Sequence, residues 1–177
     1  MKIFLAPISL IYYVVLWIRH KLYDWGILRS RRVSVPTICI GNLALGGTGK
    51  TPHVEYLISL LKDKVKVAVL SRGYKRKTRG CVIADANATA KTVGDEPLQM
   101  KRKFGDDITV AVDRNRCHGI DKLTGKESAG DIDVVLLDDA FQHRYVTPGI
   151  NILLVDYHRL IIYDKLLPAG RLREPLN

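Results

Sequence analysis

A glycine-rich run in the first third of the chain has the composition of a phosphate-binding loop. It reads GGTGKT at positions 46–51 and lies between an apolar run and a segment whose apolar residues have helical spacing. Glycines allow backbone N–H groups to curl around a phosphate, and the start of a helix adds partial positive charge. Lys50 is expected to reach the β- and γ-phosphates of a nucleotide, and Thr51 to hold Mg²⁺. The expected nucleotide-binding residues are Gly46, Gly47, Thr48, Gly49, Lys50 and Thr51.

Two carboxylates follow a later apolar run. The residues VVLL at 134–137 are followed by Asp138 and Asp139. In proteins with a phosphate-binding loop of this kind, an aspartate at the end of such a strand belongs to the magnesium shell. A strand that ends in aspartate is common by itself, so this motif gains its weight from the GGTGKT run that precedes it. We therefore expect Asp138 beside Mg²⁺ and Asp139 next to it, with a part in catalysis.

Three further polar clusters are candidates for the rest of such a site. The basic run SRGYKRKTRG at 71–80 directly follows an apolar run, which is where α/β sheets present their ligand loops. The run VGDEP places Asp95 and Glu96 between a glycine and a proline, in an expected loop. The run DDAFQHR at 138–144 adds amide, imidazole and guanidinium groups. Each cluster alone is more often a solvated loop, and a lone His143 is more often a structural histidine.

The remaining pattern predicts the elements that must position these residues. Short apolar runs rich in β-branched residues alternate with segments of helical spacing. Such alternation predicts an α/β fold of the P-loop NTPase kind, with a mostly parallel sheet flanked by helices. Strands are expected at 35–40, 65–70, 108–112, 132–137 and 150–155, with a possible short strand at 81–84, and helices at 50–62, 96–104 and 113–123.

The N-terminus is apolar. Residues 3–18 carry no charge and are followed by basic residues. A helix over this segment would rise only ~24 Å, short of the ~30 Å hydrocarbon core of a bilayer. The flanking Tyr, Trp, Arg and Lys side chains suit the membrane interface and anionic headgroups, so we expect a helix that lies in one leaflet. The alternative is a helix packed on the domain's own core.

Length, composition and charge limit the class of protein. The chain has 177 residues, of which 47% are apolar, so it can bury the core of one globular domain. Its formal net charge of +10 indicates an acidic partner: a nucleotide, a nucleic acid, a phosphorylated substrate or an anionic membrane. The aromatic residues gather mainly at the apolar N-terminus rather than among the basic residues, which disfavours nucleic acid. The three cysteines, Cys39, Cys81 and Cys117, lack zinc-binding spacing and suit reduced thiols of a cytosolic protein.

Six motifs, in their order along the chain, resemble the tetraacyldisaccharide 4′-kinase family, membrane-surface enzymes that phosphorylate a lipid A precursor. The motifs are GNLALGGTGKTP, LSRGYKRKTRG, VGDEP, VAVDRNR, LLDDAFQHR and LLPAGRLREP, and with the apolar N-terminus they extend over essentially the whole chain. Ala44 and Ala140 stand where the family more often has a hydroxyl residue and a glycine. Family members are also much longer, with a second domain after LREP that includes a histidine working beside the loop carboxylate. The resemblance therefore implies an N-terminal portion of such a kinase, without the family's C-terminal domain.

The resemblance implies a reaction and a set of roles. The γ-phosphoryl group of ATP, with Mg²⁺, would pass to the 4′-hydroxyl of a tetraacyldisaccharide 1-phosphate at the cytoplasmic face of the inner membrane. Asp95 would be the base that accepts the sugar hydroxyl proton, with Lys50 and Asp139 also in catalysis. The expected metal ligands are Thr51, Asp138 and Glu174. The expected substrate-binding residues are Arg72, Tyr74, Arg76, Gln142, His143 and Arg173.

These expectations divide the chain in two. Residues 1–32 would form a peripheral or monotopic membrane-associated helix and a basic linker, and residues 33–177 a P-loop nucleotide-binding kinase core. The expected partners are the acylated disaccharide lipid and the inner-membrane surface, with no nucleic acid and no obligate protein partner. The alternative is a membrane-bound P-loop ATPase that acts as a partner-switching regulator. Such a protein would hydrolyse ATP whether or not lipid is present.

Overall fold

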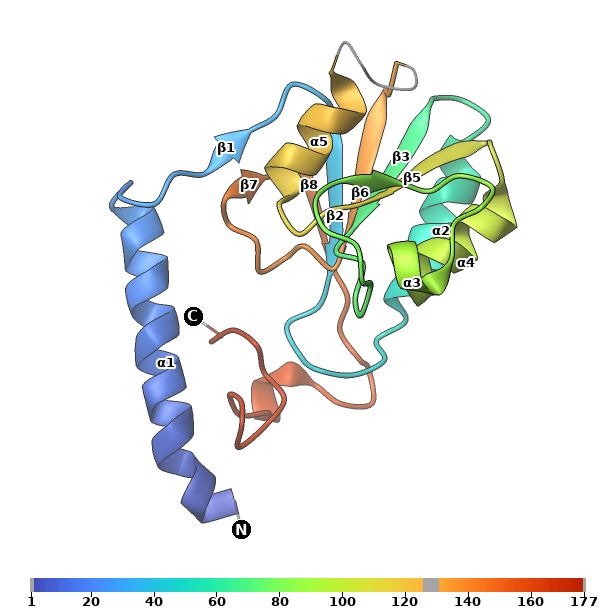
Figure 1. Ribbon diagram of the computed structural model, residues 1–177. Helices are drawn as coiled ribbons and strands as arrows, with labels where there is room; N and C mark the ends of the chain where they lie inside the picture. Colours follow the sequence, from blue (N-terminus) through green and yellow to red (C-terminus); the bar gives the residue numbers. More distant parts are fainter. Residues whose placement is uncertain (1, 126–130, 177) are drawn as a thin grey trace.

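The core of the molecule is one six-stranded sheet (Figure 1). The computed structural model describes residues 2–125 and 131–176. The strands are β2 (Thr37–Gly41), β3 (Val67–Ser71), β4 (Val82–Ile83), β5 (Ile108–Val112), β6 (Val134–Asp138) and β8 (Ile150–Leu153). Their order across the sheet is β4-β5-β3-β6-β2-β8, and every neighbouring pair is parallel except β4 with β5. The predicted α/β fold with a mostly parallel sheet is confirmed.

The central strands are apolar because both of their faces are covered. Every residue of β3 and of β6 is buried. The helices α2 (Lys50–Leu61) and α4 (Asp95–Phe104) pack on one face, and α5 (Arg116–Thr124) packs on the other (Figure 1). Parallel strands covered on both sides have continuous apolar runs rather than alternating ones. The VVLL run that precedes Asp138 follows this rule.

One prediction about local structure is wrong. The VGDEP run is not a loop, because Gly94 ends the short helix α3 (Ala90–Val93) and Asp95 begins α4. Gly94 has a φ of 95°, a backbone conformation that favours glycine. Pro97 is tolerated in the first turn of α4, where its missing N–H has no helical partner to lose. Asp95 and Glu96 therefore lie at a helix N-terminus, where negative side chains are stabilised.

The helix expected at 113–123 begins later than predicted. The side chain of Asn115 accepts a hydrogen bond from the N–H of His118 and caps α5, which starts at Arg116. Four small elements were not predicted at all. They are β1 (Arg31–Arg32), which pairs in parallel with β7 (Val146–Thr147), the helix α3, and the 3₁₀ helix η1 (Ile161–Tyr163).

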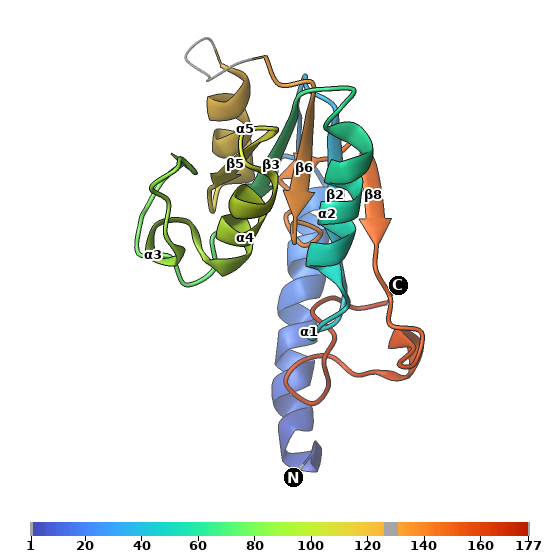
Figure 2. The ribbon, with the colours of Figure 1, turned by 90° about the vertical axis from the view of Figure 1, so that its right-hand side faces the viewer.

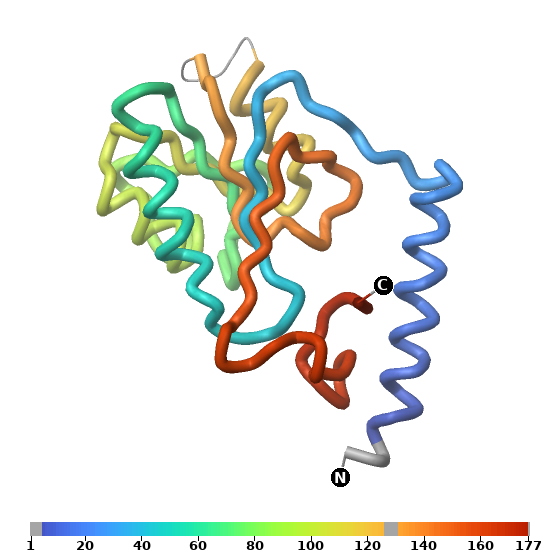
Figure 3. The backbone as a smooth tube through the Cα atoms, turned by 180° about the vertical axis from the view of Figure 1, so that it is seen from behind, coloured from blue at the N-terminus to red at the C-terminus, as the bar shows by residue number. Residues whose placement is uncertain are grey.

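Helix α1 (Lys2–Asp24) stands beside the sheet rather than on it (Figures 1 and 3). The C-terminal segment, residues 154–176, passes between α1 and the lower end of the sheet in both views. Among the described side chains of α1 only Leu16 is buried, whereas Ile11 and Val15 are 64% and 56% exposed. Within residues 2–125 and 131–176, no helix is both long and apolar enough to cross a membrane.

Candidate active site

The phosphate-binding loop lies between β2 and α2, as the sequence predicts. Gly46 and Gly49 have φ values of 136° and 74°, which residues with a Cβ rarely adopt. The amide of Asn42 donates to the hydroxyl of Thr48 at 2.9 Å, and the N–H of Leu45 donates to the carbonyl of Arg171 at 2.7 Å. The loop is thus held both by its own residues and by the C-terminal segment.

The carboxyl ends of β2, β3 and β6 meet at the lower edge of the sheet (Figure 2). Each of these strands delivers polar residues there. The hydroxyl of Ser71, at the end of β3, donates to Oδ2 of Asp138, at the end of β6, at 3.2 Å. Burial, together with the charge of neighbouring Asp139, raises the pKa of Asp138 to about 6. Parallel pairing therefore brings the loop and the predicted strand-end carboxylates to one place.

Asp139 is the centre of a chain of opposite charges. One of its carboxylate oxygens lies 3.6 Å from Nζ of Lys50, and Nη1 of Arg173 donates to both oxygens at 3.1 Å. The φ of Asp139 is 49°, an uncommon value for a residue other than glycine and one that often marks a functional site. Two cations expected to bind phosphate thus share one carboxylate.

These groups line a cavity of about 600 Å³, within the size range of sites for small ligands. Leu45, Ser71, Leu167 and Glu96 contribute to its wall. It also brings together most of the residues predicted from the sequence. These are Lys50, Thr51, Arg72, Tyr74, Asp138, Asp139, Gln142, His143, Arg173 and Glu174. A small adjoining pocket is lined by Gly46, Gly47 and Thr48.

Two predicted site residues lie elsewhere. Asp95 is exposed at the first position of α4, and the side chain of this turn that lines the cavity is Glu96. Arg76, expected to bind substrate, is buried, and its guanidinium donates to the carbonyls of Val112 at 3.1 Å and Gly80 at 2.6 Å. Burial also lowers the pKa of Arg76. This arginine therefore holds the basic loop in shape, which is a correction to its expected role.

His143 and Gln142 are placed by different means. Burial and the charges of Arg116, Arg72 and Arg19 lower the pKa of His143 to about 4, so its ring is neutral near pH 7. The amide of Gln142 donates to the carbonyl of Asn42 at 2.8 Å. His143 is thus a neutral hydrogen-bonding group in the cavity. Gln142 joins the 138–144 segment to the phosphate-binding loop.

Comparison with known proteins identifies the family. The family model described as tetraacyldisaccharide-1-P 4′-kinase matches residues 1–177. The chain belongs to this family. It is 61% identical over 173 residues to the tetraacyldisaccharide 4′-kinase of Phocaeicola vulgatus and 62% identical over 173 residues to that of Bacteroides thetaiotaomicron, covering 98% of this chain in each case. It covers 47% and 45% of those two proteins, so the chain spans about half the length of the curated relatives it matches.

A solved structure of the family has the same fold. It is the crystal structure of an "apo" form of LpxK from Aquifex aeolicus in complex with ATP, which is 40% identical to this chain with a TM-score of 0.87. The match covers 98% of this chain and 54% of that chain. The tetraacyldisaccharide 4′-kinase fold is therefore present over nearly all of this chain.

The cavity contains oxygen donors of the kinds that Mg²⁺ binds. Among the described residues, no group of three or more His, Cys, Asp or Glu side chains is placed to hold a metal ion. The cavity nevertheless holds the hydroxyl of Thr51 and the carboxylates of Asp138, Asp139 and Glu174. Mg²⁺ prefers oxygen donors and usually takes one or two carboxylates, with water and substrate phosphates as the other ligands. The residues fit such an ion.

Sequence reasoning missed the contacts of Arg116 at the end of β6. This residue is fully buried, and its Nη2 donates to the carbonyl of Asp138 at 3.1 Å. Its Nη1 donates to the carbonyl of Asp113. The VAVDRNR motif contains both residues, and the resemblance gave neither a role. In sequence this arginine cannot be told from Arg114, two residues before it, which is exposed.

Proposed function

We propose that this chain is the nucleotide-binding part of a kinase that transfers the γ-phosphoryl group of ATP to the 4′-hydroxyl of a tetraacyldisaccharide 1-phosphate, a lipid A precursor. The observation that carries the proposal is the meeting of Lys50, Thr51 and Asp138 in one cavity at the carboxyl edge of a parallel sheet. Family membership supplies the substrate class, and the related structure in complex with ATP supports ATP as the donor.

Lys50 and the N–H groups of the loop bind the phosphates. Phosphoryl transfer needs little covalent chemistry from the protein, and its rate depends on positioning and charge neutralisation. Arg173 supplies a second cation 3.1 Å from the same Asp139 carboxylate that faces Lys50. Before nucleotide binds, Asp139 neutralises both cations and keeps their side chains in place. When phosphates enter, these cations are already aimed at the cavity.

Thr51, Asp138 and Glu174 hold Mg²⁺, which when bound neutralises the charge that develops on the β- and γ-phosphates. The carboxyl of Asp138 is buried and its pKa is raised to about 6, so a cation beside it would offset the cost of burying its charge. An opposite charge close to a carboxyl favours its ionised form. The hydroxyl of Ser71 donates to Oδ2 of Asp138 and helps to orient the carboxyl.

Asp95 is the base that accepts the proton of the sugar hydroxyl. Support for this role comes from family resemblance and from its place at the N-terminus of α4, beside the cavity residue Glu96. The lipid's polar groups contact Arg72 and Tyr74, which are exposed at the cavity, and Gln142 and His143, which are partly buried in it. The neutral ring of His143 suits a hydrogen bond to a sugar hydroxyl.

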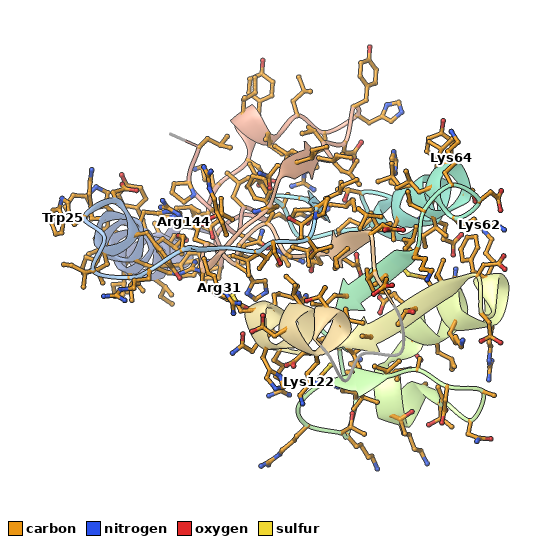
Figure 4. The ribbon with its side chains drawn as sticks, turned by 90° about the horizontal axis from the view of Figure 1, so that it is seen from above. Trp25, Arg31, Lys62, Lys64, Lys122 and Arg144 are labelled. Atoms are coloured by element: carbon orange, nitrogen blue, oxygen red, sulfur yellow. The ribbon has the colours of Figure 1, made fainter. Side chains whose placement is uncertain are left out.

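Residues 1–32 are a membrane-associated helix and basic linker, and residues 33–177 are the kinase core. Support comes from the apolar side chains of α1 that face solvent, among them Ile11, Val15 and Trp17, and from Trp25, which points away from the core (Figure 4). Such side chains beside basic residues suit the interface of an anionic membrane. The proposed location is the cytoplasmic face of the inner membrane, where a lipid substrate that stays in the bilayer is accessible.

A phosphorylation assay tests the function. Calorimetry first establishes binding of Mg-ATP to this chain. Labelled ATP is then incubated with the disaccharide precursor and the products are separated by thin-layer chromatography, with the full-length Bacteroides thetaiotaomicron kinase as positive control. When this chain is part of a full-length protein, we expect label on the lipid, and we expect Lys50→Ala to abolish it. ATP hydrolysis that is indifferent to lipid, with no labelled lipid, would favour the partner-switching ATPase instead.

A further inference from the structure

Helix α1 forms one wall of the active-site cavity. Tyr12, Leu16 and Arg19 line the cavity from this helix. The hydroxyl of Tyr12 donates to the carbonyl of Arg173 at 2.9 Å, and Nη2 of Arg19 donates to the carbonyl of Gln142 at 2.6 Å. The helix therefore contacts both the LREP motif and the DDAFQHR motif, each of which supplies residues to the site.

Two side chains of α1 hold the two oxygens of the Glu174 carboxylate. Nη1 of Arg19 lies 3.4 Å from Oε1, and Nε2 of His20 lies 2.7 Å from Oε2. The side chain of Glu174 is only 9% exposed. Because hydrogen bonds are stronger away from water, this pair of contacts fixes the direction of the carboxylate more firmly than a surface ion pair would.

Arg144 determines which nitrogen of His20 carries the proton. Nη1 of Arg144 lies 2.8 Å from Nδ1 of His20, and Nη2 donates to Oδ1 of Asp24 at 2.9 Å. Figure 4 shows Arg144 between α1 and the rest of the molecule. A guanidinium has donors only, so Nδ1 must accept. The neutral ring then carries its proton on Nε2 and donates it to Glu174.

We propose that Arg19 and His20 are positioning residues that aim the Glu174 carboxylate at the metal and phosphates, so that α1 is part of the active site as well as a membrane-facing helix. This inference rests on the proposed function, in which Glu174 helps to hold Mg²⁺. Arg144 contacts His20, and His20 contacts Glu174. In metal sites, contacts of this kind behind a ligand orient it, and losing one typically weakens metal affinity by about 10–100-fold.

The test measures how nucleotide binding by this chain depends on Mg²⁺, which requires neither lipid nor turnover. Calorimetric titrations with ATP are repeated over a series of Mg²⁺ concentrations. They give the Mg²⁺ midpoint, which is the Mg²⁺ concentration at which the enhancement of ATP binding is half-maximal. His20→Ala is expected to raise it about 10-fold or more, with binding in the absence of Mg²⁺ unchanged. His20→Gln should restore most of the loss, because its amide N–H can replace the Nε2–H donor. Arg19→Ala is expected to shift the midpoint in the same direction.

Lys21→Ala is the matched control, since Lys21 is the next cation on α1 and, in the described part of the chain, makes no contact with Glu174. A midpoint in His20→Ala equal to that of the unchanged chain would overturn the inference and leave the proposed function standing, as would an equal shift in Lys21→Ala. If His20→Ala fails to fold, Arg19→Ala decides, and an unshifted midpoint overturns the inference. An unchanged chain whose ATP binding does not respond to Mg²⁺ would refute the proposed metal site and this inference together.

Discussion

Replacing Asp138 with asparagine should stabilise the ligand-free chain at neutral pH. Asp138 is 6% exposed, and its burial, reinforced by the charge of Asp139, raises its pKa from 3.8 to about 6. The folded state therefore holds this proton more tightly than the unfolded state. The contribution of Asp138 to the free energy of unfolding is fully present below about pH 4 and is lost as the pH rises through 6. At pH 7 the loss amounts to at most about 3 kcal/mol.

The substitution Asp138→Asn removes the charge and keeps an oxygen that can accept from Ser71. For a chain of this size, 1 kcal/mol changes the melting temperature by about 2–4 °C. We expect a rise of about 3–10 °C at pH 7, measured by circular dichroism in EDTA without nucleotide, that shrinks towards zero at pH 4. Asp139→Asn is the control, because it removes the carboxylate that Lys50 and Arg173 share and should not raise stability.

A difference in melting temperature that is the same at pH 4 and pH 7 would refute this reasoning, because only the ionised form of Asp138 is destabilising. Lower stability of Asp138→Asn at pH 7 would also refute it. In either case the carboxyl would be compensated by contacts other than the hydrogen bond from Ser71 and the charge of Arg116. The expected gain in stability should come with weaker Mg-ATP binding, the usual opposition between stability and function at such a site.

Three further predictions concern binding, chemistry and membranes. Lys50→Ala should weaken Mg-ATP binding by about 10–100-fold in calorimetry, because a charge-assisted contact contributes ~1.5–3 kcal/mol; equal affinity would remove Lys50 from the phosphate site. In a full-length protein, Asp95→Ala should lower kcat by ~10²–10⁴ with ATP affinity intact, and near-normal turnover, with the loss appearing in Glu96→Ala, would transfer the base role to Glu96. Replacing the exposed Ile11 and Val15 by serine should reduce sedimentation with anionic vesicles, and high salt should reduce it only in part, since the apolar contribution persists when charges are screened. Unchanged sedimentation would favour a helix that packs on protein.

The sheet and the centre of the site could be predicted because their residues act close to where they stand in sequence. Lys50 and Thr51 follow the loop directly, and Asp138 ends its strand. Parallel pairing then brings these strand ends to one edge without further information. The same local reasoning failed for VGDEP, because glycine and proline mark a loop and also mark the start of a helix.

Other roles depended on contacts between distant segments. Arg76 has the same appearance in sequence as its basic neighbours, yet its guanidinium binds the carbonyl of Val112, 36 residues away. His20 was given no role from the sequence, and its ring binds Glu174, 154 residues away. Neither contact leaves a pattern in a single sequence, because each needs the folded chain to bring its two ends together.

Because Lys50 and Arg173 share the carboxylate of Asp139, binding of nucleotide should exchange one anionic partner of these cations for another. The side chain of Lys50 is 17% exposed and that of Arg173 is 23% exposed, and in the free protein both face an internal anion rather than dissolved ions. If Lys50 and Arg173 bind the phosphates as proposed, the phosphates replace Asp139 as their partner, and few dissolved anions should be displaced. Because salt screens exposed charges much more than partly buried pairs, the affinity for ATP should fall with ionic strength less steeply than the number of basic residues at the site suggests.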